Sequence, residues 1–264
     1  MTDAGSPLTR TFAACREEGR AALVLYVTAG HPSPAATSEV LRMLAEAGAD
    51  IIELGVPFSD PLADGPTIQR SSFEAIAQGA DLAWTLETLA RFRSEHATPV
   101  VLFSYLNPIL RYGTERFLRD AAAAGAEGVL VTDLPAGADP ELERAFADSP
   151  LDLIRLIAPT TRPERVREIA ASARGFLYYV SRTGVTGARE ALAENLTREV
   201  AEIRALTDLP VAVGFGISTP EQAAEVARVA DGVVVGSALV DMLGREGVEE
   251  ARRFVTSISQ AMRL

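Results

Sequence analysis

Eight short and almost uninterrupted apolar runs recur along this chain of 264 residues, and segments with helical periodicity separate them. The runs occupy residues 22–28, 50–55, 99–103, 127–131, 151–157, 175–180, 209–213 and 232–235. Continuous apolar runs are typical of strands that are buried on both faces, as in parallel sheets. The junction Ala-Gly-Ala followed by an acid leads into two of the runs, and a similar Val-Ala-Asp-Gly stretch leads into the last one. These junctions indicate a repeated helix–strand unit.

Eight such units in about 250 residues predict an α/β fold in which the strands close into a (β/α)8 barrel, the TIM barrel. We expect a single domain over residues 1–264, with an extra, short polar helix at 7–19 before the first strand. An open, doubly wound sheet is the less favoured alternative, because the first run lacks the glycine fingerprint of a dinucleotide site.

Helix boundaries can be read from capping residues. Ser33 is expected to cap a helix over 33–47, which Gly48 ends. Another helix is expected to begin at Pro66, since proline suits the first helical position. The core positions that we predict for this second helix are Ile68, Phe73 and Ile76.

Composition excludes several kinds of chemistry. All 25 basic residues are arginine, so no lysine Schiff base can form with a substrate or with pyridoxal phosphate. Cys15 is the only cysteine, and the only histidines, His31 and His96, lack metal-ligand spacing. We therefore expect no metal site and both histidines at the surface. The net charge of −11 argues against nucleic-acid binding.

The first 20 residues lack the long apolar core of a signal peptide, and no apolar run reaches membrane-spanning length. We therefore expect a cytoplasmic protein that does not engage a membrane.

The stretch 51–67 carries most of the chemical information. It places one carboxylate, Glu53, inside an apolar strand and two more, Asp60 and Asp64, in a loop rich in glycine and proline. A buried carboxylate costs free energy unless it is paired or protonated, and such groups concentrate at functional sites. A carboxylate at a strand end that is solvated or bound to backbone N–H groups is the structural alternative.

Active sites of (β/α)8 barrels lie at the C-terminal ends of the strands. Glu53, Asp64 and Asp133 should meet there, and if they are close they should raise one another's pKa values. Burial should raise the pKa of Glu53 in particular, whereas Asp64, in a polar loop, should stay ionised. The same end of the barrel should carry Tyr178 and Tyr179, which lie in strand six, and Phe215, which follows strand seven.

Two glycine turns follow strands seven and eight, at 214–218 and 236–237. Barrels often bind phosphate there, through backbone N–H groups and a helix N-terminus. Ordinary turns, with Ser218 and Ser237 as helix caps, are the alternative. The glycine-spaced segment 181–189 suits a lid, or otherwise a surface loop.

Two motifs together resemble the signatures of the tryptophan synthase alpha chain family. They are Glu-Leu-Gly-Val-Pro-Phe-Ser-Asp-Pro-Leu-Ala-Asp-Gly-Pro-Thr-Ile-Gln at 53–69 and Ser-Arg-Thr-Gly-Val-Thr-Gly at 181–187. The resemblance covers nearly the whole chain, from the strand end at 26–30 onward. It implies a (β/α)8 lyase that cleaves indole-3-glycerol phosphate to indole and glyceraldehyde 3-phosphate in tryptophan biosynthesis. It also implies no cofactor in this chain, and an alpha2-beta2 complex with a beta chain that carries pyridoxal phosphate and receives the indole.

The resemblance also implies roles for individual residues. Glu53 would be the general acid/base and Asp64 the second carboxylate. Asp60 and Pro61 would lie on the loop that faces the beta chain. The residues implied for the indole pocket and the lid are Tyr26, Phe103, Tyr105, Leu130, Tyr178, Thr186 and Phe215. The residues implied for the phosphate are Gly187, Gly216, Gly236 and Ser237.

The chemistry agrees with these roles. Cleavage of this carbon–carbon bond is a retro-aldol step that needs an electron sink, and indole protonated at C3 can be that sink. One carboxylate that gives and takes a proton and another near the ring N–H then suffice. Two alternatives remain at this point: another phosphate-binding barrel enzyme, such as a sugar-phosphate isomerase, and a non-catalytic barrel that only activates a partner.

Overall fold

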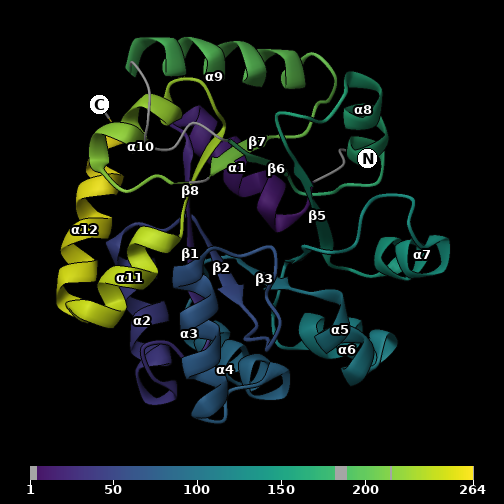
Figure 1. The fold of residues 1–264 in the computed structure, drawn as a ribbon, viewed down its shortest axis with the longest axis vertical. Coiled ribbons are helices and arrows are strands. Elements are labelled where there is room, and N and C mark those ends of the chain that lie inside the picture. Colours follow the sequence, from purple (N-terminus) through teal and green to yellow (C-terminus); the bar gives the residue numbers. More distant parts are fainter. Residues whose placement is uncertain (1–4, 182–188, 215, 264) are drawn as a thin grey trace.

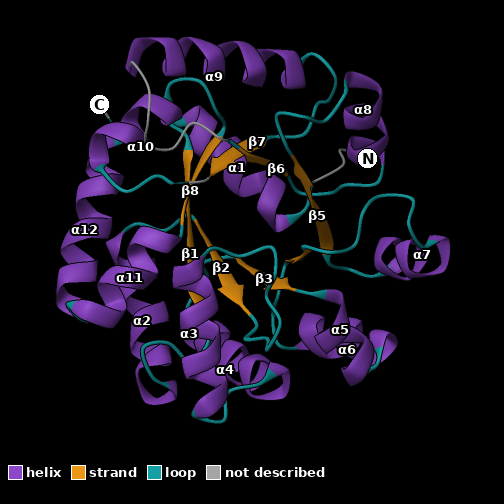
Figure 2. Cartoon of the chain, viewed as in Figure 1, coloured by secondary structure: helices purple, strands orange, loops and turns teal. Residues whose placement is uncertain are grey.

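The computed structural model describes residues 5–181, 189–214 and 216–263, and within them strands β1 to β8 close a parallel barrel in chain order. Figures 1 and 2 show the helices arranged around the strands. The strands are β1 (Ala22–Thr28), β2 (Ile51–Gly55), β3 (Val100–Ser104), β4 (Gly128–Val131), β5 (Asp152–Ile157), β6 (Leu177–Val180), β7 (Val211–Gly214) and β8 (Gly232–Val235). Every predicted run forms one strand, with ends within two residues of the prediction. The TIM-barrel prediction is confirmed.

The helices of the described residues are α1 (Pro7–Glu17), α2 (Pro34–Ala47), α3 (Pro66–Ala77), α4 (Leu82–Glu95), α5 (Leu106–Tyr112), α6 (Thr114–Ala123), α7 (Pro140–Asp148), α8 (Pro163–Ala171), α9 (Arg189–Arg204), α10 (Pro220–Ala227), α11 (Ser237–Arg245) and α12 (Val248–Ala261). Ser33 caps α2, because its side chain accepts the N–H of Ala36, and Gly48 ends that helix at a φ of 111°. None of the described helices has the length and apolar character needed to cross a membrane.

Side-chain alternation along each strand divides the core into two parts. In β1, Leu23 and Leu25 face the surrounding helices, whereas Val24 and Tyr26 face the barrel interior. In β2, Ile52 and Leu54 pack in the outer core, while Ile51 belongs to the interior cluster. This period of two places Glu53, two residues after Ile51, inside the barrel.

Helix α1 closes the N-terminal end of the barrel. Leu8, Phe12 and Cys15 are buried in the interior cluster, and the rings of Phe12 and Phe176 are 5.2 Å apart. Gly232 leaves room for this contact, since a Cβ atom there would lie 2.9 Å from the Phe12 ring. The short polar helix expected before the first strand is present as α1, and its few apolar residues, spaced four and three apart, form one buried face.

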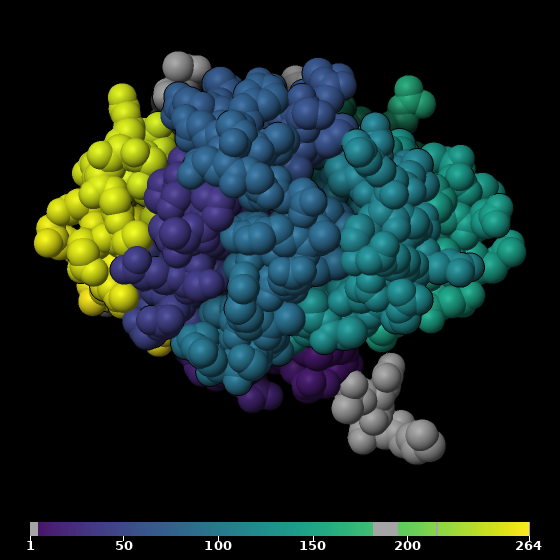
Figure 3. Space-filling view, turned by 90° about the horizontal axis from the view of Figure 1, so that it is seen from below, coloured from purple at the N-terminus to yellow at the C-terminus, as the bar shows by residue number. Residues whose placement is uncertain are grey.

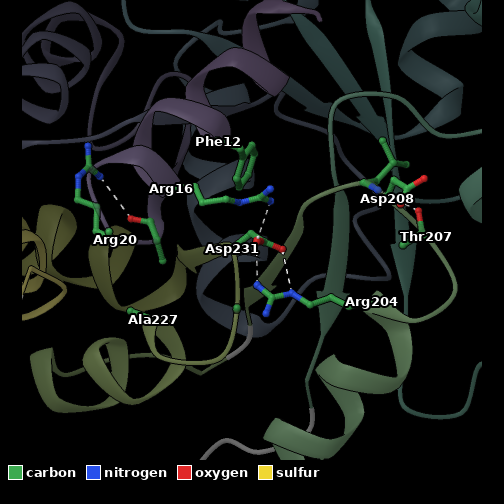
Figure 4. Close-up of a pocket in the computed structure, with 12 residues that line it drawn as sticks. Phe12, Arg16, Arg20, Arg204, Thr207, Asp208, Ala227 and Asp231 are labelled. Carbon is green, nitrogen blue, oxygen red and sulfur yellow. Dashed lines mark hydrogen bonds and ion pairs between the residues drawn. The ribbon is translucent and has the colours of Figure 1, made fainter.

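Ion pairs surround the closed end (Figure 4). The Asp231 carboxylate lies between two guanidinium groups, 3.2 Å from Arg16 and 2.8 Å from Arg204. It also accepts the backbone N–H of Val211 at 2.9 Å. Asp231 thus joins α1, α9 and the start of β7 at the base of the barrel.

Helix α3 differs from the prediction in the face that it buries. Phe73 and Ile76 are 49% and 37% exposed, whereas Ser71, Ser72 and Ala75 are buried together with Ile68. Small residues on the inner face let the helix approach the end of β1 closely, and the hydroxyl groups of Ser71 and Thr28 are 2.7 Å apart. The larger side chains are left on the surface that α3 and α4, blue in Figure 3, form at the centre of that view.

The prediction for His31 was also wrong. Its side chain is 5% exposed, and Nε2 lies 3.0 Å from the carbonyl oxygen of Val240 in α11. Nδ1 lies 3.5 Å from a carboxylate oxygen of Glu74 in α3. His31 therefore joins two helices to the loop after β1. His96 is half-buried, and its ring stacks on that of Phe92.

Candidate active site

A cavity of about 490 Å³ opens at the C-terminal ends of the barrel strands. Residues from β1, β2, β3, β5, β6 and β8 line it, as do parts of the loops that follow β2 and β7 and the start of α11. Glu53 and Asp64, the two carboxylates that the resemblance implied for catalysis, are among these residues. The cavity therefore lies where barrel enzymes carry their active sites.

Glu53 is buried in the wall of this cavity. Its side chain is 1% exposed, and neither carboxylate oxygen has a hydrogen-bond partner among the described residues. Burial raises the pKa of Glu53 to about 8, because a charged carboxylate loses its hydration there and gains no compensating bond. The group can therefore hold a proton at neutral pH and exchange it with a bound molecule.

Asp64 lies in the loop between β2 and α3. Its Oδ2 accepts a hydrogen bond of 2.9 Å from the hydroxyl group of Tyr105, which in turn accepts the N–H of Ala63 at 2.9 Å. Partial burial raises the pKa of Asp64 to about 6, and the bond from Tyr105 opposes that rise. The loop is less polar than the sequence suggested, yet the carboxylate remains mostly ionised at neutral pH.

The acids do not raise one another's pKa values as expected. Burial accounts for the raised pKa of Glu53, without a contribution from either aspartate. Asp133 does not line the cavity; its Oδ1 accepts the N–H of Leu106 at 2.6 Å, at the start of α5. The two cavity carboxylates thus differ through their surroundings, which suits them to different tasks.

Aromatic side chains form the apolar wall beside Glu53. Tyr26, Phe103 and Tyr178 line the cavity, and the rings of Tyr26 and Phe103 meet edge to face at 5.2 Å. Gly55 makes space for this wall, because a Cβ atom there would lie 2.3 Å from the Tyr26 hydroxyl oxygen. Tyr179, the neighbour of Tyr178, instead points outward and donates a hydrogen bond to Glu199 in α9.

The structure places the other expected pocket residues differently. Leu130 is fully buried in the barrel interior and does not line the cavity. Tyr105 does not line the cavity, but its hydroxyl group donates a hydrogen bond to Asp64, which does. Thr186 and Phe215 lie outside the described residues. The cavity-lining residues that the sequence analysis missed include Thr67, Ile68, Thr132, Leu156, Ile217 and Val234. Strand register would have found Leu156, which pairs with Tyr178 across β5 and β6.

One side of the cavity suits a phosphate group. Gly216, Gly236 and Ser237 line it, and Gly216 has a φ of 73°, which glycine adopts readily. No side chain caps the N-terminus of α11 at Gly236, so the backbone N–H groups of its first turn are free for an anion. Asp241, one turn further, is paired with Arg70 at 3.0 Å. Gly187 lies outside the described residues.

The loop that carries Asp64 also carries the residues expected to face a partner. Asp60 is exposed, as expected, but Pro61 is buried. Leu62, which the sequence analysis did not single out, is 81% exposed. An apolar side chain so fully exposed beside a charged one marks this loop as a candidate contact surface.

A parallel (β/α)8 barrel with a buried carboxyl group, a second carboxylate that is mostly ionised and an uncapped helix N-terminus around one cavity suits acid/base chemistry on a small phosphorylated substrate. Among the described residues, no group of three or more His, Cys, Asp or Glu side chains could hold a metal ion.

Comparison with known proteins defines the family. Residues 12–263 match the family model of the tryptophan synthase alpha chain. The tryptophan synthase alpha chain of Citrifermentans bemidjiense is 52% identical over 261 residues, 97% of this chain and 98% of the relative. The crystal structure of the alpha subunit from Legionella pneumophila has a TM-score of 0.90 at 36% identity and covers 98% of this chain and 99% of its own. A structure of Mycobacterium tuberculosis tryptophan synthase has a TM-score of 0.90 at 40% identity, with the same coverage of each chain.

The chain belongs to the tryptophan synthase alpha chain family. It is a carbon–carbon lyase that cleaves indole-3-glycerol phosphate to indole in tryptophan biosynthesis. The family uses no cofactor in the alpha chain, and pyridoxal phosphate belongs to the beta chain.

Proposed function

We propose that this chain cleaves indole-3-glycerol phosphate by proton transfer through Glu53, with Asp64 stabilising the charge that develops on the indole ring. The observation that carries the proposal is the carboxyl group of Glu53, buried, without a hydrogen-bond partner among the described residues and in the wall of the cavity. A group with a pKa of about 8 is protonated at neutral pH and gives its proton without a large cost.

The reaction can be written with these two groups. Glu53 donates its proton to C3 of the indole, and positive charge develops on the ring, next to the ionised Asp64. The Glu53 carboxylate then takes the proton of the glycerol hydroxyl group that becomes the aldehyde. As that carbonyl forms, the bond between the ring and the side chain breaks and its electron pair returns to the indole. Glyceraldehyde 3-phosphate and indole are released, and Glu53 is protonated again.

The remaining cavity residues orient the substrate. Tyr26, Phe103 and Tyr178 offer ring faces and edges to the indole, and aromatic contacts of this kind favour one plane of binding. Gly216, Gly236 and Ser237, with the free N–H groups of α11, would hold the phosphate group at the other side of the cavity. Thr186, Phe215 and Gly187 keep the roles that the family motif implies for them.

We further propose that the whole chain acts as one barrel domain in the cytoplasm and binds a beta chain through the loop at 58–66, in an alpha2-beta2 complex. Asp60 and Leu62 support this assignment because both are exposed on the loop that carries Asp64. A partner that fixes this loop would also fix the second carboxylate.

An assay of indole release from purified chain tests the proposed function. The chain should produce indole and glyceraldehyde 3-phosphate in equal amounts from indole-3-glycerol phosphate, slowly by itself and faster with a beta chain. Production of neither compound in either condition would contradict the assigned chemistry and leave the non-catalytic alternative.

A further inference from the structure

A second cavity, of about 430 Å³, lies beside the active-site cavity, between the β4–α7 loop and the N-terminal end of α8. Thr132 and Leu156 line both cavities. Three arginines line the second one, and none of its described lining residues is acidic. The chain as a whole has a net charge of −11, so a cavity lined by three cations and by no described acid differs in charge from the rest of the molecule. The arginines are Arg155, Arg162 and Arg165.

Arg155 is the most buried of these three cations, and protein groups surround its guanidinium group. Arg155 is 4% exposed; its Nη1 donates to the carbonyl oxygen of Leu134 at 2.7 Å, and its Nη2 pairs with Glu143 at 2.7 Å. Its Nε is buried without a hydrogen-bond partner among the described residues. Burial lowers the pKa of Arg155, and the charge of Arg165 lowers it further, against the opposing effect of Glu143. Arg155 and Arg165 thus bring two positive charges to the lining of this cavity.

The other two cations are poorly neutralised. Arg165 donates to the carbonyl oxygen of Ala136 and pairs with Glu168 at 2.9 Å, but Glu168 is 64% exposed, so solvent screens that pair. Arg162 is exposed and forms no ion pair within residues 5–181, 189–214 and 216–263. The described residues that line the mouth of the cavity thus carry positive charge only, while Glu168 and Glu164, which is in the first turn of α8, lie outside that lining.

Helix α8 adds to this positive potential. Arg162 occupies its N-cap position and provides no side-chain cap, and Pro163 opens the helix. The backbone N–H groups that follow in the first turn have no acceptor within the helix, and the helix dipole places its positive end there. An oxyanion at this place would be bound both by the helix end and by side chains.

The cavity at the base of the barrel shows the opposite arrangement (Figure 4). It is also lined by three arginines, but Asp208 and Asp231 line it too, and Asp231 pairs with both Arg16 and Arg204. Those cations serve the structure of the chain itself. None of the described residues that line the cavity beside the active site is acidic, and the acids that pair with Arg155 and Arg165, Glu143 and Glu168, lie outside that lining.

We propose that the cavity between the β4–α7 loop and α8 binds a small organic anion, whose carboxylate or phosphate group contacts Arg162, Arg165 and the first turn of α8. The body of the ligand lies against Leu134, Pro135 and Ile169, which line the same cavity. The volume suits a molecule of the size of a substituted aromatic acid. Guanidinium groups bind both head groups through paired N–H donors.

Calorimetric titration with two probes tests this proposal, at one ionic strength throughout. Benzoate represents the carboxylate head group and phenyl phosphate the phosphate head group; the tighter of the two identifies the preferred class. Benzoate or phenyl phosphate should bind with a Kd of about 1 mM or lower. The double variant Arg162→Gln with Arg165→Gln should bind the preferred probe about tenfold or more weakly, because two charged donors are lost.

A matched control removes the same charge from the same region. Arg144→Gln with Arg167→Gln changes two exposed arginines of α7 and α8 that do not line the cavity, and it should leave the affinity within about twofold. A crystal soaked with p-bromobenzoate should show bromine signal in this cavity. The proposal is overturned if both double variants bind each probe equally, or if neither probe binds saturably to the unaltered chain.

Discussion

The two carboxylates of the active site differ in the form that their surroundings favour. Glu53 is buried without a hydrogen-bond partner among the described residues, so its neutral form is favoured and its pKa lies near 8. Burial raises the pKa of Asp64 only to about 6, because the hydrogen bond from Tyr105 opposes the rise. At neutral pH one group is mostly protonated and the other mostly ionised, which is the pair that the proposed protonation of the indole requires.

Replacement of each carboxylate tests this division of tasks. Glu53→Gln keeps the shape of the side chain but cannot transfer a proton, so kcat should fall roughly 10²–10⁴-fold or more. Asp64→Asn should lower kcat less, because the amide oxygen can still accept the bond from Tyr105. The dissociation constant of the substrate should change little in both variants, since the phosphate-binding residues are unaltered. A folded Glu53→Gln variant, checked by circular dichroism, with near-normal kcat would sink the assignment.

The same pKa values fix the dependence of activity on pH. The acid form of Glu53 is lost as pH rises through about 8, and the ionised form of Asp64 is lost as pH falls through about 6. A plot of kcat/KM against pH should therefore be bell-shaped, with its maximum between these two values. Asp64→Asn should remove the acidic limb and keep the alkaline one. A profile with no alkaline limb would contradict the raised pKa of Glu53.

At the scale of elements, α1 has a structural task that its polar composition hides. Three of its residues, Leu8, Phe12 and Cys15, fill the interior at the closed end of the barrel. Phe12→Ala should lower the free energy of unfolding by about 3–5 kcal/mol, because it leaves a cavity against Phe176. Glu17→Ala, an exposed change on the same helix, is the control and should have little effect. Urea denaturation measures both, and equal midpoints would show that α1 is dispensable.

The sequence predicted the strands better than the helices. A strand buried on both faces, such as β4 or β8, is a continuous apolar run with little ambiguity. For helix α3, the apolar pattern predicted the wrong buried face. Close packing places Ser71, Ser72 and Ala75 on the inner face and leaves Phe73 exposed. The seven-residue α5 was not located at all, since it is too short for a periodic pattern.

The candidate site was likewise predicted only in part. Motifs in continuous stretches of sequence located Glu53 and Asp64, and the cavity contains both. Contacts between distant stretches were not readable, such as the bond from Tyr105 to Asp64 or the two helices that enclose His31. They depend on how strand ends and loops meet in space, which local sequence patterns do not encode.

At the scale of the whole molecule, the loop with Asp60 and Leu62 should couple activity to the beta chain. We expect the isolated chain to be slow and a beta chain to accelerate indole release, because binding would order the loop that carries Asp64. Leu62→Glu should weaken this acceleration and leave the rate of the isolated chain unchanged, since Leu62 is 81% exposed and outside the cavity.

Steady-state rates over a titration of beta chain measure the coupling. Ala13→Glu, which adds the same charge at an exposed position on α1, is the control and should be accelerated as fully as the unaltered chain. Equal rates with and without a beta chain would remove the coupling, and equal acceleration of both variants would remove Leu62 from the contact.

Because α1 and the interior cluster that it joins fill the N-terminal end of the barrel, the active-site cavity opens at the opposite, C-terminal rim. Among the described residues, substrate and products therefore pass through this rim, so the products must leave before the next substrate molecule enters. Any protein bound over this rim therefore controls both the entry of substrate and the release of products. A beta chain bound to the loop at 58–66, as proposed above, would receive the departing indole before it reaches bulk water.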